Sequence, residues 1–267
     1  MTLPFLTQAQ APLTCEVSAV NEFGEHISVS IPAERALAVY VDKRELVTLM
    51  TLGAHPELLV LGYLLNQWLV KRADEIESIT VDWDVGAAAV KTWHGIADVE
   101  EKTAKRVVTT GCGQGSVFGG LMDEVDQIKL PVDASITQGQ LYALVNTIRL
   151  KETTYKSAGS VHACALFDSA DSQPAMLIFV EDVGRHNAID TIAGWMSTNS
   201  EKLGSSNLVF YTTGRLTSEM VIKSAQMDVP IVISRSGITQ MGHQVADRKS
   251  TRLNSSHSRR SRMPSSA

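Results

Sequence analysis

The stretch that decides the fold is MLIFVEDVGRHNAIDTIAGWMS, residues 176–197. Its apolar beginning, residues 176–180, predicts a buried strand, and residues 187–197 predict a helix. Between them, residues 181–186 hold two acids, an arginine and a histidine, which is an unusual density of charge. A strand, a charged loop and a helix in this order are typical of α/β proteins that bind a ligand beyond the end of a strand.

The alternation of strands and helices continues around this stretch. We expect further elements at 161–167, 208–211, 218–227, 231–234 and 239–246. This pattern predicts βαβ units and a partly parallel sheet that is covered by helices. The loops expected at the carboxyl ends of its strands, where ligands bind in such sheets, are 181–186, 212–216 and 235–237.

The first hundred residues predict a smaller α+β region. Two apolar runs, 36–41 and 46–52, are separated by charged residues and indicate a hairpin. Pro56 suits the first turn of a helix that continues with a stripe of leucines. Alternation of polar and apolar residues predicts a half-buried strand at 26–30, and weaker strand candidates are 79–83 and 87–93. Further along, Thr137 and Gln140 match a capping box, which predicts a helix that ends near residue 152.

Charge divides the chain into an acidic body and a basic tail. Residues 249–267 hold one Lys, four Arg and no acid, so the net charge of −5 conceals a body of −10. An acidic body argues against DNA or RNA as the main partner. The tail holds seven serines and little apolar surface. We therefore favour a disordered, non-native extension over a basic arm for RNA or membranes.

Neither a membrane span nor a secretory signal is predicted. No apolar run reaches the roughly 18 residues that cross a bilayer, and no basic segment followed by an apolar one opens the chain. Three cysteines in 267 residues do not build a disulfide framework. We expect a cytoplasmic protein with no membrane partner.

A cysteine flanked by glycines lies in TTGCGQGS, residues 109–116. Cys112 therefore has little side-chain cover and a mobile backbone, which suits a thiolate that must reach a partner. A small apolar residue in a tight turn is the alternative. The loop lacks the ending of a phosphate-binding P-loop, and Gly115 stands where a C-x-x-C pair would have its second cysteine.

His162 and Cys164 lie two residues apart and share one face of a predicted strand. The spacing permits a pair of metal ligands, but a buried core thiol is the more common case, and we expect no metal site. A nucleotide deaminase is disfavoured because the H-x-E and P-C-x-x-C motifs of its zinc site are absent.

Arg185 and Arg215 each follow a predicted strand. A guanidinium can bind a phosphate through two hydrogen bonds, and the helix expected from Ser218 would add positive potential. A solvated loop in which Asp or Asn caps the next helix is the alternative interpretation of residues 181–187.

Together these segments resemble the formate dehydrogenase accessory sulfurtransferases, the FdhD family. The resemblance covers roughly residues 15–248. It is carried by 56–64 (PELLVLGYL), 110–113 (TGCG), 159–163 (GSVHA), 181–190 (EDVGRHNAID) and 214–223 (GRLTSEMVIK). It implies a cytidine-deaminase-like α-β-α sandwich with a mixed, partly parallel sheet, next to the smaller N-terminal α+β region.

The resemblance also implies a function. Such proteins accept sulfur from a cysteine desulfurase as a persulfide, at the position of Cys112, and pass it to the molybdenum or tungsten bis-pterin guanine dinucleotide cofactor of formate dehydrogenase. Arg185, His186 and Arg215 would bind that cofactor or a guanine nucleotide. A non-catalytic chaperone of the molybdenum cofactor is the alternative, and a homodimer is compatible with the sequence.

The expected division of the chain is a loose N-terminus (1–14), the α+β region (15–108), the sulfurtransferase core (109–248) and a disordered, non-family tail (249–267). The family continues past Arg248 with a strand and a loop that contact the cofactor. We therefore expect this chain to bind cofactor poorly and to leave a sheet edge open beside residues 231–234.

Overall fold

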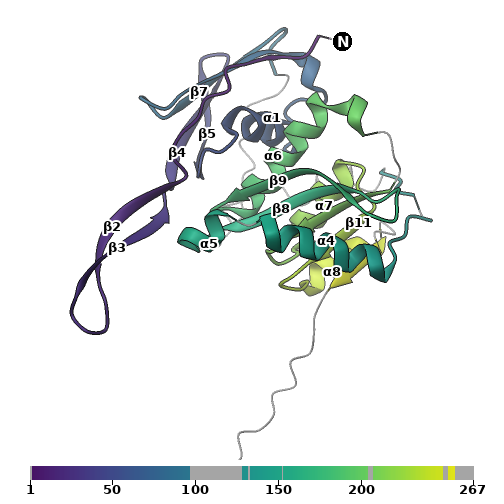
Figure 1. Ribbon diagram of the computed structural model, residues 1–267. Helices are drawn as coiled ribbons and strands as arrows, with labels where there is room; N and C mark the ends of the chain where they lie inside the picture. Colours follow the sequence, from purple (N-terminus) through teal and green to yellow (C-terminus); the bar gives the residue numbers. More distant parts are fainter. Residues whose placement is uncertain are drawn as a thin grey trace, which may run out of the picture.

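Two sheets and a protruding two-stranded ribbon make up the structure, a computed structural model (Figure 1). It describes residues 2–96, 128–131, 133–151, 153–203, 207–248 and 252–255. Among the helices of these ranges, none is long and apolar enough to cross a membrane. The loop around Cys112 lies outside the described residues.

The first sheet belongs to the N-terminal third, with strand order β1-β6-β7-β4-β5. Its strands are β1 (Phe5–Leu6), β4 (Arg35–Val41), β5 (Arg44–Thr51), β6 (Ile76–Asp82) and β7 (Ala87–Thr92). The predicted hairpin is confirmed, with Asp42 and Lys43 as a two-residue turn in which both φ angles are positive. Such a turn matches the twist of the flanking strands.

Helix α1 (Pro56–Asn66) packs its leucines on this sheet, and a short 3-10 helix, Ala73–Glu75, leads into β6. Pro56 lies in the first turn of α1, as the sequence predicts. Its missing N–H costs nothing there, because the first amides of a helix have no partner within the helix.

The second sheet has the order β12-β11-β10-β8-β9. Its strands are β8 (His162–Asp168), β9 (Ala175–Asp182), β10 (Leu208–Thr212), β11 (Ile231–Ser234) and β12 (Arg252–Ser255). β8 runs antiparallel to both β9 and β10, whereas β10, β11 and β12 are parallel. The carboxyl ends of β9, β10 and β11 and the beginning of β8 therefore lie along one edge of the sheet.

Helices cover both faces of the second sheet. They are α4 (Gln138–Lys151), α5 (Thr154–Ala158), α6 (Arg185–Thr198), α7 (Ser218–Gln226) and α8 (Gln240–Arg248), with a 3-10 turn at Ser200–Lys202. Alternate residues of β8 point to opposite layers: Cys164 and Leu166 pack with α6 and α7, and Phe167 packs with α4. The expected α-β-α sandwich is confirmed, and its sheet is mixed and partly parallel.

The capping box at the start of α4 is also present. The backbone N–H of Thr137 donates to Oε1 of Gln140 at 2.9 Å, and the N–H of Gln140 donates to Oγ1 of Thr137 at 3.2 Å. Each side chain thus satisfies an amide that the helix leaves without an internal partner.

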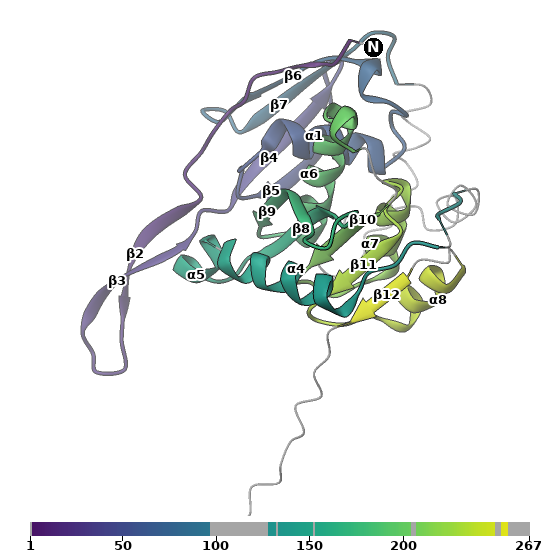
Figure 2. The ribbon, with the colours of Figure 1, turned by 45° about the vertical axis from the view of Figure 1, so that its right-hand side comes forward.

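Helices α1 and α6 cross at close range and join the two halves of the molecule (Figure 2). A Cβ on Gly62 would lie 1.6 Å from the carbonyl oxygen of Asp190, and one on Gly194 would lie 2.0 Å from that of Leu58. No side chain fits at either position, so glycine sets the distance between the helices.

Strands β2 (Thr14–Val20) and β3 (His26–Pro32) form the antiparallel ribbon, which extends away from the body of the protein in both views (Figures 1 and 2). Alternation within residues 26–30 predicts β3. The pairing strand β2 was not predicted, although residues 15–19 alternate between apolar and polar as β3 does.

Two expectations about the chain ends need correction. Residues 1–14 are not a loose lead-in, because β1 pairs in parallel with β6, and Thr7 Oγ1 and Ala9 N donate to the Glu57 carboxylate at 2.7 and 2.6 Å. The expected disorder of the tail is wrong for Arg252–Ser255, which pairs in parallel with β11 and covers the edge expected to be open. Residues 249–251 and 256–267 lie outside the description.

Candidate functional site

The charged loops predicted at the strand ends come together at one edge of the second sheet. The predicted loop 181–186 is shorter than expected, since β9 ends at Asp182 and α6 begins at Arg185. The predicted loop 212–216 begins with the last residue of β10, and loop 235–237 follows β11. His162 begins β8 and pairs with Asp182 at the end of β9. The antiparallel β8 thus brings a histidine to the edge where the other strands end, which the strand pattern did not predict.

Arg185 begins α6 and is the central cation of this edge. Arg185 is 7% exposed, and its Nε–H is buried without a hydrogen-bond partner. Gly214 makes room for the side chain, since a Cβ there would lie 2.9 Å from Cδ of Arg185. A buried guanidinium with an unused donor is costly unless an anion completes it, so this position is suited to a phosphate or carboxylate.

His186, the next residue of α6, is held by an acid from α7. Its Nε2 lies 3.1 Å from Oε2 of Glu219. Burial alone would raise the pKa of Glu219, but the hydrogen bond to His186 and the charge of Lys223 outweigh burial and lower that pKa. Glu219 is therefore a carboxylate at neutral pH, and it orients the imidazole of His186.

A buried ion pair between α6 and α7 stabilises this arrangement. Lys223 Nζ lies 2.8 and 2.9 Å from the two carboxylate oxygens of Asp190, and Asn66 Nδ2 donates to Asp190 Oδ1 at 2.7 Å. Asp190 is fully buried and Lys223 is 2% exposed. The network links α1, α6 and α7, and it fixes the register of the two helices that supply His186 and Glu219.

His162 and Arg215 are the remaining polar side chains of this edge. Arg215 is exposed, and His162 is half-buried. Burial lowers the pKa of His162, and the positive charges of Arg185, His186 and Arg215 lower it further. These cations are therefore close enough to influence one another, and His162 is a neutral imidazole at pH 7.

Glu181 and Asp182, the two acids of the predicted site, have structural roles. The Glu181 carboxylate accepts hydrogen bonds from the backbone of Thr154 and Tyr155 at 2.9 and 3.1 Å, so it caps α5. Asp182 accepts from Thr51 Oγ1 and from the N–H of Leu52, at 2.5 and 3.1 Å, and so ties the first sheet to the second. Burial raises the pKa of Asp182 despite these bonds.

Hydroxyl groups hold the loops after β10 and β11 in place. Thr212 Oγ1 accepts from the N–H of Gly214 at 3.0 Å. Ser234 Oγ donates to the carbonyl of Gly214 at 2.8 Å and accepts from the N–H of Gly237 at 3.0 Å. These bonds rigidify the backbone that carries Arg215.

The described cysteines differ from one another. Cys164 is fully buried, and desolvation raises the pKa of its thiol to about 12, so it is an inert thiol. The prediction of a core thiol is confirmed. Cys15 is exposed on the ribbon. Cys112, the predicted sulfur carrier, lies outside the described residues, and its role stays a prediction.

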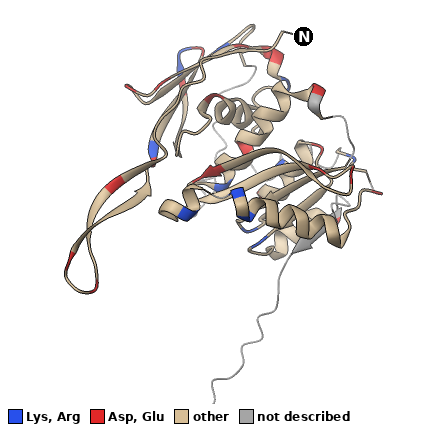
Figure 3. Cartoon of the chain, in the orientation of Figure 1, with Lys and Arg blue, Asp and Glu red and all other residues tan. Residues whose placement is uncertain are grey.

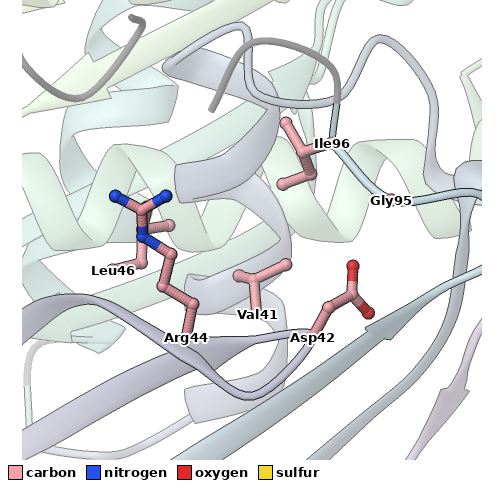
Figure 4. A pocket seen from close by; sticks show the side chains of 6 residues that line it. All are labelled: Val41, Asp42, Arg44, Leu46, Gly95 and Ile96. Atoms are coloured by element: carbon pink, nitrogen blue, oxygen red, sulfur yellow. The ribbon is translucent and has the colours of Figure 1, made fainter. Parts of the chain in front are cut away.

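No group of three or more His, Cys, Asp or Glu side chains in the described ranges is placed to hold a metal ion. A hollow of about 220 Å³ lies elsewhere, at the turn between β4 and β5 (Figure 4). The Asp42 carboxylate in its wall already accepts hydrogen bonds from N and Oγ1 of Thr92, at 3.0 and 2.7 Å. The hollow therefore lacks the unpaired charge that marks the strand-end site.

Comparisons with known proteins agree with the resemblance. The family model for the FdhD/NarQ family matches residues 32–257, past the boundary predicted at residue 248. A protein of Bacillus subtilis named sulfur carrier protein FdhD is 31% identical over 220 residues, which cover 80% of this chain and 79% of that protein. A protein of the same name from Bacillus pumilus is 32% identical over 215 residues, with the same shares covered.

A solved structure supports the fold. A crystal structure from Desulfotalea psychrophila, named as a candidate formate dehydrogenase accessory protein, superimposes with a TM-score of 0.69 at 23% identity and covers 91% of this chain and 93% of its own. The family model spans most of the chain, and curated relatives exceed 30% identity along four-fifths of it. The chain belongs to the FdhD/NarQ family.

Proposed function

We propose that this protein is a sulfurtransferase that carries sulfur on Cys112 from a cysteine desulfurase to the molybdenum cofactor of formate dehydrogenase. The observation that carries the cofactor side of the proposal is Arg185, a buried cation with an unused N–H donor at the end of β9. Family membership and the names of the relatives support the sulfur carrier side.

The strand-end site matches the chemistry of the guanine dinucleotide part of that substrate. Its diphosphates are anionic, and Arg185 and Arg215 are cations at this edge. Arginine binds phosphate through parallel hydrogen bonds, which lysine cannot reproduce. His186, oriented by Glu219, begins the same helix beside Arg185 and offers a further polar contact.

The sulfur steps balance with thiol chemistry alone. The Cys112 thiolate attacks the outer sulfur of the desulfurase persulfide, a new S–S bond forms on Cys112, and the desulfurase thiolate leaves. A low-molecular-weight thiol from solution, acting as the reductant, then attacks the Cys112 sulfur, forms a mixed disulfide with it and releases the outer sulfur as sulfide to the metal. The two electrons that sulfide needs come from this thiol pair.

The thiol environments favour Cys112 over the alternatives. Cys164 cannot serve, because its thiol is buried and has a pKa of about 12. Cys15 is exposed, but it lies on the ribbon and not at the strand-end site. A loop with glycines on both sides of Cys112 suits a carrier that must visit two partners.

Sulfur loading tests the carrier role. The purified protein is incubated with a cysteine desulfurase and cysteine, and peptide mass spectrometry locates any added sulfur atom. We expect one added sulfur on Cys112, no loading of Cys112→Ala, and full loading of the matched control Cys15→Ala. Loading that survives in Cys112→Ala, or that occurs on Cys15, would overturn the assignment. A cofactor chaperone without sulfur chemistry would load nothing, and Cys112→Ala would keep its support of formate dehydrogenase.

Nucleotide binding tests the cofactor side separately. Calorimetry with GDP should show binding that falls about tenfold or more in Arg185→Ala and in Arg215→Ala, since each charge-assisted bond is worth roughly 1.5–3 kcal/mol. Arg149→Ala, on the exposed surface of α4, is the control and should bind GDP normally. If both site variants bound GDP with unchanged affinity, the cofactor would not bind at this edge.

A further inference from the structure

The end of β5 is fixed on the first sheet, close to where it meets the second. Thr51, the last residue of β5, is 1% exposed. Gly53 follows with a φ of +78°, in the left-handed region, and a Cβ there would lie 2.5 Å from Cζ2 of Trp83. The N–H of Gly53 donates to Thr51 Oγ1 at 3.1 Å. Because glycine alone fits this turn, the hydroxyl of Thr51 is held in one place.

The hydroxyl of Thr51 directs its single proton to the second sheet. Its Oγ1 accepts from Gly53 and donates to Oδ2 of Asp182 at 2.5 Å, and the N–H of Leu52 donates to the same oxygen at 3.1 Å. Asp182 is the last residue of β9 and is 4% exposed. Figure 3, in the orientation of Figure 1, shows acidic residues at this end of β9, next to the end of β5. The first sheet therefore binds the acid that precedes the cationic loop.

The other oxygen of Asp182 binds the start of α6. Its Oδ1 accepts from the N–H of Gly184 at 2.9 Å and from Nδ2 of Asn187 at 2.8 Å. The same Nδ2 donates to the carbonyl of Met50 on β5 at 2.6 Å. The loop after β9 is thus closed on itself and bonded to β5. We call the hydrogen bonds of Thr51, Asp182 and Asn187 the β5–α6 junction.

Arg185 lies within this closed loop, as the first residue of α6. The donors of the β5–α6 junction and of Gly184 occupy both carboxylate oxygens of Asp182, so the acid acts on Arg185 through the backbone. Further along, α6 is held where it crosses α1, near Asp190 and Gly194. The first turn of α6 precedes that crossing, so its position depends on the junction.

We propose that Thr51, on the first sheet, is a positioning residue of the strand-end site. Through Asp182 and Asn187 it holds the first turn of α6, and so the guanidinium of Arg185, in the place where an anion binds. A donor that is already in position loses less freedom when its ligand arrives, so the junction strengthens binding without touching the ligand. The effect on binding rests on the proposed cofactor site, whereas the effect on the position of Arg185 does not.

The position of Arg185 is measurable without a ligand. Its buried Nε–H gives a signal in proton–nitrogen correlation spectra, which is assigned by its loss in Arg185→Lys. Thr51→Val keeps the shape of the side chain but removes the hydroxyl, so we expect this signal to shift or broaden. Thr51→Ser keeps the hydroxyl and should show the wild-type signal. Thr48→Val, the same change at an exposed position of β5, is the matched control and should not move it. An unmoved signal in Thr51→Val would overturn the inference.

Calorimetry with GDP tests the consequence for binding. Thr51→Val should weaken GDP binding by about two- to thirtyfold, the range for a residue that acts on a site without touching the ligand. Thr51→Ser and Thr48→Val should bind GDP as the wild type does. In an Arg185→Ala background, Thr51→Val should cause no further loss, because the residue through which it acts is gone. An equal loss in both backgrounds would show that Thr51 does not act through Arg185.

The two measurements separate this inference from the proposed function. If the wild type does not bind GDP, or Arg185→Ala binds it normally, the cofactor site is wrong, and the Nε–H signal alone decides the role of Thr51. If Arg185→Ala weakens binding but Thr51→Val does not, the cofactor site stands and the positioning role is wrong.

Thermal unfolding checks that every variant is folded at the temperature of these measurements. Asn187→Ala is the second variant, in case Thr51→Val does not fold, because it removes the bonds to Asp182 and Met50 from the side of α6. It should move the Arg185 signal in the same way, and its effect on GDP binding should also vanish in the Arg185→Ala background. An unmoved signal in this variant would equally contradict the role of the β5–α6 junction.

Discussion

Two buried cations in this molecule have opposite surroundings. Lys223, between α6 and α7, has its ammonium bound to both oxygens of Asp190 at 2.8 and 2.9 Å. Arg185, at the edge where β9 ends, has a buried Nε–H with no hydrogen-bond partner. Both residues are less than a tenth exposed, at 2% and 7%. Burial is therefore the same, and only the pairing differs.

The difference separates a charge that is paired within the protein from one that has a buried donor without an acceptor. The cost of burying Lys223 is offset within the protein, so that region is complete without any other molecule. The buried Nε–H of Arg185 has no hydrogen-bond acceptor among the described residues, although the charge of Glu219 acts on the guanidinium, and an anion would supply that acceptor. Substitutions in the first region should therefore affect folding, and substitutions in the second should affect binding.

The largest effect is expected from removing the partner of the structural cation. Asp190→Ala leaves Lys223 as an unpaired buried charge and removes the acceptor of Asn66. Loss of one partner of a buried pair typically costs about 3–5 kcal/mol in the free energy of unfolding. Urea denaturation followed by circular dichroism measures the loss, and Asp84→Ala on the surface is the control. A loss no larger than that of the control would show that the pair is not structural.

The second prediction tests the other cation. Arg185→Met keeps most of the packing of the side chain beside Gly214 but removes the guanidinium. We expect the free energy of unfolding to stay equal or to rise, because a buried donor without an acceptor is gone. GDP affinity should fall about tenfold or more, as expected for a charge-assisted contact worth roughly 1.5–3 kcal/mol. Thermal unfolding and calorimetry on the same samples separate the two effects.

If Arg185→Met were less stable than wild type but bound GDP with unchanged affinity, the contrast between Arg185 and Lys223 would be wrong. It would mean that the Arg185 stem is a core element and that its guanidinium faces no ligand. Thermal unfolding of the wild type with and without GDP gives an independent check, since a ligand that binds only the folded state raises its stability.

Local signals in the sequence predicted much of the fold. Pro56 marks the start of α1, and the apolar runs on either side of Asp42 and Lys43 form the expected hairpin. The strands β1 and β12 were missed because each is short and pairs with a segment that is distant in sequence, whereas β2 was missed although its residues alternate between apolar and polar. Short strands of this kind are defined by their partners and not by their own composition.

The candidate site was predicted less completely than the fold. The sequence placed Arg185 and Arg215 at strand ends, and the structure brings them to one edge. It gave no sign that Glu181 caps α5, since the capped amides lie more than twenty residues earlier. Nor did it show that Glu219 holds His186, because that contact arises only once α6 and α7 pack on the same face of the sheet.

A double-mutant cycle sharpens the first half of the comparison. Lys223→Met should be destabilising alone, because it leaves Asp190 buried without its cation, and Asp190→Asn should be destabilising alone for the converse reason. The double variant should lose less stability than the two singles together, by about 0.5–3 kcal/mol, as expected for residues in direct contact. Additive losses would indicate that the two groups act independently.

The smallest expected effect concerns pH and the acid that connects the two regions. Burial works to raise the pKa of Glu219, but His186 and Lys223 outweigh it, so the folded pKa is lower than the unfolded one. The unfolded state then binds more protons, so this carboxylate contributes stability above its ordinary pKa, and the contribution is lost as pH falls through the folded value. The effect of Asp182 on the pH dependence of stability has the opposite sign, because its pKa is raised. This effect is the same in wild type and in a Glu219 variant, so it cancels when the two are compared.

Urea denaturation at pH 7 and pH 4 should therefore show a smaller acid-induced loss of stability in Glu219→Gln than in wild type, whereas the exposed control Glu201→Gln should follow wild type. An equal acid-induced loss in all three proteins would mean that Glu219 is not held as a carboxylate by the two cations. His186 would then lack the partner that orients it toward the strand-end site.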